Sequence, residues 1–156
     1  MSYAELQVTT HFSFLRGASS ADELFQTAKA LGISALGVVD RNSLAGIVRA
    51  LEASRETKIR LVVGCRLDLQ GGMSILVYPT DRAAYSRLTR LLTLGKARGG
   101  KANCILHLDD VAQFAEGLIG VLVPDLPDEV CAVQLRKMAE IFGDRAYGAL
   151  TLRRRP

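Results

Sequence analysis

Few side chains in this sequence have the type and spacing needed for chemistry, and most of them lie near its start. His11 is close to Ser13 and Ser19, a combination that could support nucleophilic catalysis, but no carboxylate is placed beside them to complete a triad. Asp40 is the best single acid, although its position before a predicted helix also suits a helix cap or a partner for Arg41. Phosphate-binding glycine loops, the GxSxG turn and the HExxH motif are missing. The sequence therefore carries none of these enzyme signatures.

The histidines and cysteines do not suggest a metal or redox site. His11 and His107 are far apart in the sequence, and each is more readily explained as a surface residue than as a metal ligand. The cysteines are odd in number and form no CxxC pair, so we expect three reduced, structural side chains at Cys65, Cys104 and Cys131.

The elements that must position the chemical groups begin with a strand, a loop and a helix. Gln7 and Thr9 alternate with apolar residues and are expected on one face of the first strand. Ser20 and Glu23 predict a capping box that opens the first helix. Loops that follow the carboxyl ends of strands carry the chemistry in α/β folds, so positions 7, 9 and 16 (Arg16) are where function is expected.

The rest of the chain continues to alternate between strands and helices. Further strands are predicted at residues 33–39, 61–67, 73–78, 117–123 and 144–152, with a hairpin at Gly71–Gly72. Further helices are predicted to open at residues 40–43, 79–81, 107–110 and 124–128. The first two helices are expected to bury Leu24, Ala28 and Leu31, and then Leu44, Ile47, Val48 and Leu51. This alternation is typical of an α/β fold with a parallel sheet or barrel.

Size and composition limit the class of protein. At 156 residues and 49% hydrophobic content, residues 1–156 are expected to form a single domain, without a membrane span or signal peptide and located in the cytoplasm. The formal net charge of +4 suits contact with nucleic acid but does not require it. Arg98–Lys101 is expected to be a flexible basic loop, and Arg153–Arg155 a solvated end. The absence of tryptophan argues against a base-stacking surface.

Several motifs in order resemble one family. Leu6–Ser19 resembles the opening of the polymerase and histidinol phosphatase (PHP) domain of bacterial DNA polymerase III alpha subunits. Similar motifs follow in the family's order at Val39–Gly46, Val63–Arg66, Ala84–Leu88, Gly117–Ile119 and Phe142–Tyr147. Phe12–Ser19 and Ser43–Ala50 are most similar to the error-prone, translesion branch. The resemblance implies a distorted (β/α) TIM-like barrel, present here as an incomplete N-terminal portion because the family's domains are longer. We therefore expect an excised segment, with an open sheet edge or pairing between copies.

The resemblance also assigns metal-site positions. Active members hold two or three metal ions, and their ligands, which begin with a His-x-His pair, correspond to six residues of other types: Gln7, Thr9, Arg16, Arg41, Arg66 and Ser74. A hydrolytic metal site needs imidazoles and carboxylates, whereas the three arginines carry fixed positive charges that repel divalent cations. The resemblance thus implies the fold, with no metal cofactor and no phosphoesterase activity.

The expected role is a non-catalytic scaffold or partner surface in an error-prone polymerase. The partners implied are the remainder of the alpha subunit, other replication or mutagenesis subunits, and DNA bound through the parent chain. One alternative is that Arg16, Arg41 and Arg66 form a site for a phosphate, a nucleotide or a DNA end. In the simpler alternative, each arginine pairs with a carboxylate such as Asp40 or Asp68. An active metal-dependent phosphoesterase is disfavoured.

Overall fold

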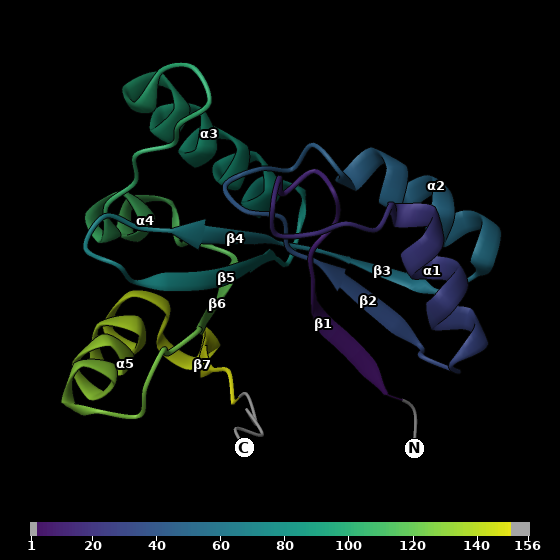
Figure 1. The fold of residues 1–156 in the computed structure, drawn as a ribbon. Helices are drawn as coiled ribbons and strands as arrows, with labels where there is room; N and C mark the ends of the chain where they lie inside the picture. The colour runs from purple at the N-terminus through teal and green to yellow at the C-terminus, as the bar shows by residue number, and fades with distance from the viewer. Residues whose placement is uncertain (1–2, 151–156) are drawn as a thin grey trace. The chain divides into compact units, whose positions relative to one another are not determined.

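The computed structural model describes residues 3–150, which are drawn in colour in Figure 1. The chain divides into two compact units, Met1–Leu67 and Asp68–Pro156, which are described separately here. The predicted tail Arg153–Arg155 lies outside the described residues. Within residues 3–150, no helix has the length and apolar character needed to cross a membrane.

The first unit is built on a parallel three-stranded sheet with the strand order β1–β2–β3. Its elements are β1 (Ala4–Val8), α1 (Ala21–Ala30), β2 (Ala35–Val38), α2 (Ile47–Thr57) and β3 (Arg60–Val63). Figure 1 shows α1 and α2 against this sheet. Apolar side chains of both helices share one core with the sheet, and its buried members are Val8, Ala21, Phe25, Ala28, Leu36, Val38, Ala50 and Ala53. The predicted parallel sheet is confirmed in this unit.

Helix α1 begins where the sequence predicts. The Ser20 hydroxyl accepts a hydrogen bond from the Glu23 N–H, and the Glu23 carboxylate accepts one from the Ser20 N–H, which completes the capping box. Gly32 ends the helix with a φ of 71°, a conformation that glycine adopts without strain. The predicted buried face is partly wrong: Phe25 is buried, whereas Leu31 follows the last helical turn and is exposed.

Helix α2 begins later than predicted. The sequence favours an opening at residues 40–43, but the helix starts at Ile47 after Gly46. Asp40 is not its cap because the Asp40 carboxylate is engaged by the loop after β1. With this start, the buried face is formed by Ala50 and Ala53, and the larger Val48 and Leu51 remain exposed.

The strand predicted at residues 61–67 is two strands. β3 ends at Val63, and β4 (Cys65–Asp68) begins after Gly64 and belongs to a second sheet. The Gly64 N–H still donates to the Val38 carbonyl, so the chain after β3 continues beside the end of β2. The glycine within the apolar run was the sequence signal for this break.

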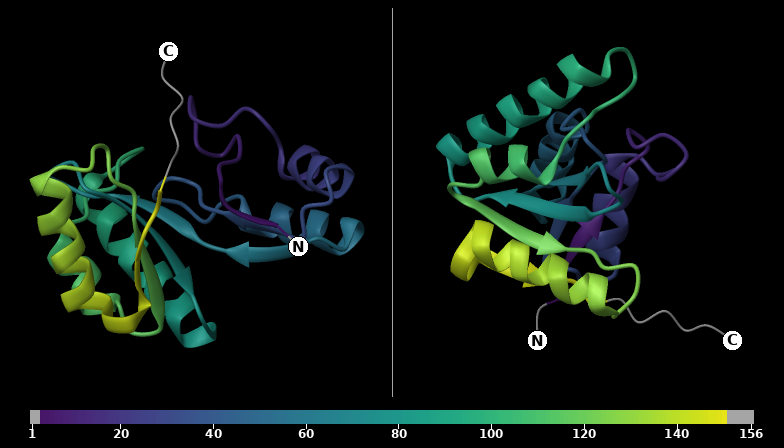
Figure 2. Two further views of the ribbon diagram at one scale, coloured as in Figure 1. Left: turned by 90° about the horizontal axis from the view of Figure 1, so that it is seen from below. Right: turned by 90° about the vertical axis from the view of Figure 1, so that its left-hand side faces the viewer.

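The second unit contains a mixed sheet. Its elements are β5 (Ser74–Pro79), α3 (Arg82–Gly99), α4 (Leu108–Phe114), β6 (Leu118–Leu122), α5 (Glu129–Phe142), a 3₁₀ turn (Gly143–Arg145) and β7 (Ala146–Gly148). The strand order is β4–β5–β6–β7, with β5 and β6 antiparallel and β6 and β7 parallel. This sheet is therefore not the parallel one that the strand–helix alternation favours. Figure 2 shows the sheet between α3 and α5. The core includes Ile75, Val77, Leu88, Leu91, Leu118, Leu122, Met138 and Phe142.

Two local predictions for the second unit have different outcomes. The hairpin turn is confirmed, since Gly71 and Gly72 have φ values of 91° and 85° between neighbouring strands. The prediction of a flexible basic loop at Arg98–Lys101 is wrong for its first half. Arg98 lies in the last turn of α3, and its guanidinium donates to the Asp110 carboxylate at 2.5 Å.

Candidate functional site

The loop after β1 is fixed to the end of β2 by a buried carboxylate. Asp40 is 1% exposed, and its carboxylate accepts hydrogen bonds from the Thr10 N–H (2.9 Å), the Thr10 hydroxyl (2.8 Å) and the Ser13 hydroxyl (2.7 Å). Three donors compensate a carboxylate that burial alone would destabilise. Asp40 therefore orders the loop.

Ser13 connects two of the predicted site positions through their backbones. Its hydroxyl oxygen accepts a hydrogen bond from the Arg41 N–H at 2.9 Å, and its carbonyl accepts one from the Arg16 N–H at 2.9 Å. The same hydroxyl donates to Asp40. One serine thus brings the backbones of residues 16 and 41 close together.

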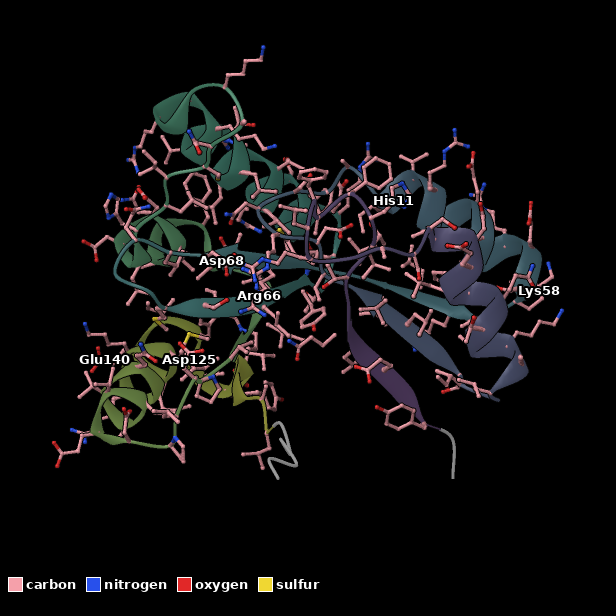
Figure 3. All side chains as sticks on the ribbon, in the orientation of Figure 1. His11, Lys58, Arg66, Asp68, Asp125 and Glu140 are labelled. Carbon is pink, nitrogen blue, oxygen red and sulfur yellow. The ribbon has the colours of Figure 1, made fainter. Side chains whose placement is uncertain are left out.

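Arg41 and Arg66 lie side by side. They are paired in a parallel β-bridge, in which the Arg66 N–H donates to the Asp40 carbonyl and the Asn42 N–H donates to the Arg66 carbonyl. Residues paired across adjacent strands project to the same face of a sheet. Both arginines are half-buried and have interaction partners. The backbone hydrogen bonds therefore gather positions 16, 41 and 66 near the carboxyl end of β2. Figure 3 labels Arg66, on β4, and His11, on the loop after β1.

The other three predicted positions are Gln7 and Thr9, at the carboxyl end of β1, and Ser74 in the second unit. Gln7 is exposed on β1, and its backbone N–H donates to the Glu5 carboxylate at 2.9 Å. Thr9 lies just beyond β1, which ends at Val8. Ser74 belongs to the second unit, where its hydroxyl donates to the Asp68 carboxylate at 2.7 Å.

His11 does not form a catalytic relay with Ser13. The His11 ring stacks on Phe12 with 4.6 Å between ring centroids, and its Nδ1 lies 3.3 Å from the Ser19 carbonyl. No carboxylate lies near Ser13 in the sequence, yet the Asp40 carboxylate accepts a hydrogen bond from its hydroxyl. The local pattern did not predict this contact because the two residues are 27 positions apart in the sequence.

The chemistry of the gathered residues suits anions rather than metal ions. A guanidinium group has five N–H donors and no lone pair to coordinate a cation. Among residues 3–150, no group of three or more histidine, cysteine, aspartate or glutamate side chains could hold a metal ion. Asp40, the buried carboxylate at this end of the sheet, is already engaged by Thr10 and Ser13. The gathered side chains are therefore not the imidazoles and carboxylates that a hydrolytic metal site needs.

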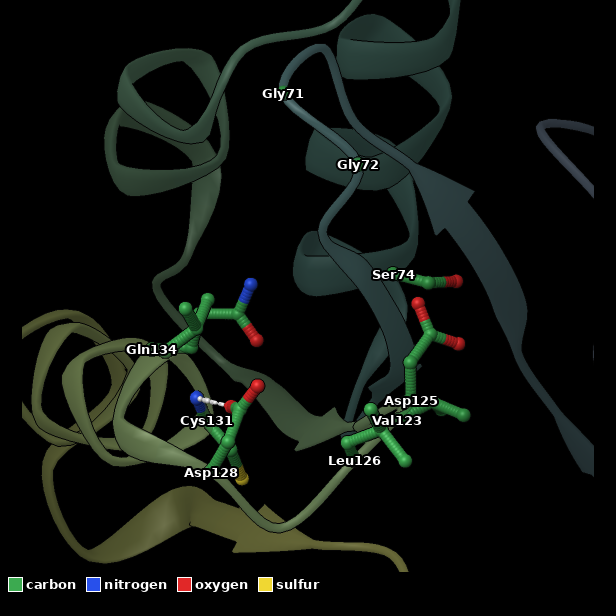
Figure 4. Close-up of a pocket in the computed structure, with 10 residues that line it drawn as sticks. Gly71, Gly72, Ser74, Val123, Asp125, Leu126, Asp128, Cys131 and Gln134 are labelled. Atoms are coloured by element: carbon green, nitrogen blue, oxygen red, sulfur yellow. Dashed lines mark hydrogen bonds between the residues drawn. The ribbon is translucent and has the colours of Figure 1, made fainter.

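The second unit holds a separate pocket of about 260 Å³ (Figure 4). Its polar wall includes Asp125, Asp128 and Cys131. The Asp128 carboxylate caps α5 by accepting a hydrogen bond from the Cys131 N–H at 2.9 Å. The Asp128 carboxylate in this wall therefore has a structural role as the N-cap of α5.

Comparison with known families gives one match over most of the chain. The family model described as "PHP domain" matches residues 5–148.

Curated relatives match the chain along its full length. It is 85% identical over 100% of its length to error-prone DNA polymerase 2 of Rhizobium meliloti, and 81% identical over 99% to error-prone DNA polymerase 3 of Agrobacterium fabrum. It is 51% identical over 97% of its length to an error-prone DNA polymerase of Caulobacter vibrioides. The chain spans about 14% of the length of the first two relatives and 15% of the third.

Two solved structures share the fold. A candidate metal-dependent phosphoesterase from Bifidobacterium adolescentis has a TM-score of 0.66 and 14% identity, over 87% of this chain and 74% of that one. An amidohydrolase from Chromobacterium violaceum, described with bound sulfate and no metal, has a TM-score of 0.65 and 14% identity, over 94% of this chain and 76% of that one. These similarities place the α/β architecture among partial distorted TIM-like barrels.

Proposed function

The chain belongs to the PHP domain family, and we propose that it is a non-catalytic PHP-type domain of an error-prone DNA polymerase III alpha subunit. In this role it supports the parent polymerase as a scaffold or partner surface and hydrolyses no phosphoester. The identity of 81–85% to proteins named error-prone DNA polymerases supports the assignment of the parent. Damage-induced translesion synthesis and a cytoplasmic location are parts of the same proposal.

The gathered arginines are the observation that carries the proposal. Ser13 holds the backbones of Arg16 and Arg41, and Arg66 is paired beside Arg41. Positive side chains at all three positions oppose the binding of Mg²⁺, Mn²⁺ or Zn²⁺. The remainder of the alpha subunit, other replication or mutagenesis subunits and DNA bound through the parent chain are the proposed partners.

Metal analysis of the purified protein tests the proposal. We expect no stoichiometric metal, and no hydrolysis of a generic phosphodiester after addition of Mn²⁺ or Zn²⁺. Tightly bound metal, or turnover that a chelator abolishes, would overturn the scaffold role.

A variant with metal-ligating residues provides the matched positive control. It carries His at positions 7, 9 and 41, Asp at 16 and Glu at 66, that is Gln7→His, Thr9→His, Arg41→His, Arg16→Asp and Arg66→Glu. If the scaffold role is correct, this variant binds more metal than the natural chain when circular dichroism shows that both are folded. Equal metal content in the two proteins would contradict the proposed role of the arginines.

A second candidate function is the binding of a phosphate, a nucleotide or a DNA end. The parallel bridge between Arg41 and Arg66 favours it, because two guanidinium groups on one face suit the oxygens of a phosphate. Titration with inorganic phosphate and a 5′-phosphorylated oligonucleotide, at low and high salt, tests it. Binding that weakens with salt and is lost in Arg66→Gln supports the anion site, and an absence of binding at low salt excludes it.

A further inference from the structure

The loop between β1 and α1 exposes two large apolar side chains at its tip. Phe14 is 84% exposed and Leu15 is 85% exposed, and the neighbouring Phe12 is also exposed. Figure 2 shows this loop projecting beyond the end of β1. Leaving two adjacent large apolar side chains in water forgoes the gain that burial would supply.

The loop has a defined conformation. The His11 N–H donates to the Ser19 carbonyl at 2.9 Å and closes its base, and the Gly17 N–H donates to the Ser13 carbonyl at 3.0 Å. Gly17 packs so tightly that a Cβ there would lie 2.3 Å from the Thr10 carbonyl oxygen. Together with the hydrogen bonds to Asp40, these contacts hold the tip in place.

Leu15 has an unfavourable backbone conformation at the tip. Its φ of 60° lies in the left-handed region, where a side chain with a Cβ is disfavoured by about 1 kcal/mol or more. No burial among the described residues offsets this cost, because the Leu15 side chain faces solvent. A glycine or an asparagine would fit the turn better. The choice of leucine is explained if its side chain is used outside this segment.

We infer that Phe14 and Leu15 insert into an apolar pocket on the part of the polymerase polypeptide that lies outside this chain. This inference rests on the proposed function. The error-prone polymerases that the chain resembles at 81–85% identity have about 86% of their length outside the matched segment, which supplies the partner surface in the same polypeptide. Arg16 follows the tip, so the rim of the pocket is expected to be acidic. Single-stranded DNA fits less well, since only Phe14 of the two tip side chains offers a ring for base stacking.

Photo-crosslinking in the full-length polypeptide tests the inference. Phe14 is replaced by a benzophenone-bearing phenylalanine, and cross-linked peptides are identified by mass spectrometry after irradiation. We expect intramolecular products that join position 14 to peptides beyond residue 156. The matched control carries the same group at Leu31, which is 70% exposed on the same unit, and is expected to give about tenfold less of these products.

A second measurement follows the contact without a chemical label. Phe14→Ser with Leu15→Ser in the full-length polypeptide removes the apolar tip but leaves the hydrogen bonds of Ser13 and Asp40 in place. We expect limited proteolysis to release the N-terminal segment about tenfold faster, with no change in Leu31→Ser.

Three outcomes would overturn the inference. They are cross-links confined to the first 156 residues, cross-links between two copies, and cross-links to added single-stranded DNA in place of protein. None of them alters the metal content, so a failure of this inference is distinguishable from a failure of the scaffold role.

Discussion

The Ser13 hydroxyl donates a 2.7 Å hydrogen bond to the buried Asp40 carboxylate and accepts a 2.9 Å hydrogen bond from the Arg41 N–H. The serine is therefore both donor and acceptor between a loop and a strand end that are 27 residues apart. The second hydrogen bond fixes the position of the Arg41 backbone, from which the side chain extends. It also makes the network sensitive to the loss of either residue.

Removal of the Asp40 carboxylate is expected to destabilise the chain. Asp40→Ala leaves the donors of Thr10 and Ser13 without their acceptor in a buried site, and we expect a loss of about 3 kcal/mol in the free energy of unfolding. Urea unfolding measures it. Asp22→Ala, on the exposed side of α1, is the control and should change the free energy by less than about 0.5 kcal/mol. An equal effect of the two substitutions would contradict the proposed role of Asp40.

The capping box at the start of α1 predicts a pH dependence. The Ser20 backbone N–H and then the Ser20 hydroxyl donate to the Glu23 carboxylate and lower its pKa. Because the folded pKa is lower than the unfolded one, this contribution to stability is present above the unfolded value of about 4.3 and is lost as the pH falls through the folded pKa. Glu23→Gln, which cannot titrate, should lose less α1 stability on acidification.

Stability curves of the natural chain and Glu23→Gln at neutral and acidic pH measure this difference. Ser20→Ala provides the second comparison, because it removes the N-cap and should cost about 1 kcal/mol at neutral pH. Identical acid dependence in the natural chain and Glu23→Gln would exclude the capping carboxylate as its source.

The ion pair between Arg98 and Asp110 predicts a second acid-sensitive contact. The hydrogen bond from Arg98 is the main reason that the pKa of Asp110 is lowered, and it outweighs the opposing effect of burial. In Arg98→Gln the pKa of Asp110 should rise. In the natural chain, the contribution of Asp110 to the free energy of unfolding is lost only as the pH falls through its lowered folded pKa. In the variant, this contribution would be lost at a higher pH. Titration of the Asp110 carboxyl by NMR measures the shift, and Asp109→Asn is the neighbouring control. An unchanged Asp110 titration in Arg98→Gln would show that the pair is not formed in solution.

Close packing between β1 and β2 predicts the effect of adding one methyl group. A Cβ at position 37 would lie 2.5 Å from the Leu6 carbonyl oxygen, so Gly37→Ala must separate the two strands. We expect a loss of about 2–4 kcal/mol. The control is Gly148→Ala, whose added Cβ would lie at an ordinary 3.4 Å from Leu135. Thermal unfolding of both variants measures the difference, and Gly37→Ala is expected to unfold at the lower temperature.

Local signals in the sequence predicted local structure well. The Ser20–Glu23 capping box and the hairpin at Gly71–Gly72 each depend on residues a few positions apart, and both are confirmed. The resemblance over several motifs predicted the family and the α/β architecture, which the comparisons support.

Distant contacts were not predictable in the same way. Asp40 looked like a helix cap because Arg41, Asn42 and Ser43 follow it, yet its partners are Thr10 and Ser13. The apolar faces of α1 and α2 were partly wrong because both depend on where each helix begins and ends. The absence of metal and the scaffold role stay predictions until they are measured.

The framework around the arginines consists of hydrogen bonds to their backbones. The N–H groups of Arg16, Arg41 and Arg66 bond to Ser13 and Asp40, and none of these bonds involves a guanidinium group. Any residue other than proline could make them. In evolutionary terms, these backbone hydrogen bonds do not depend on which side chain occupies the three positions, proline excepted. A lineage that changes one of these side chains therefore keeps this part of the framework.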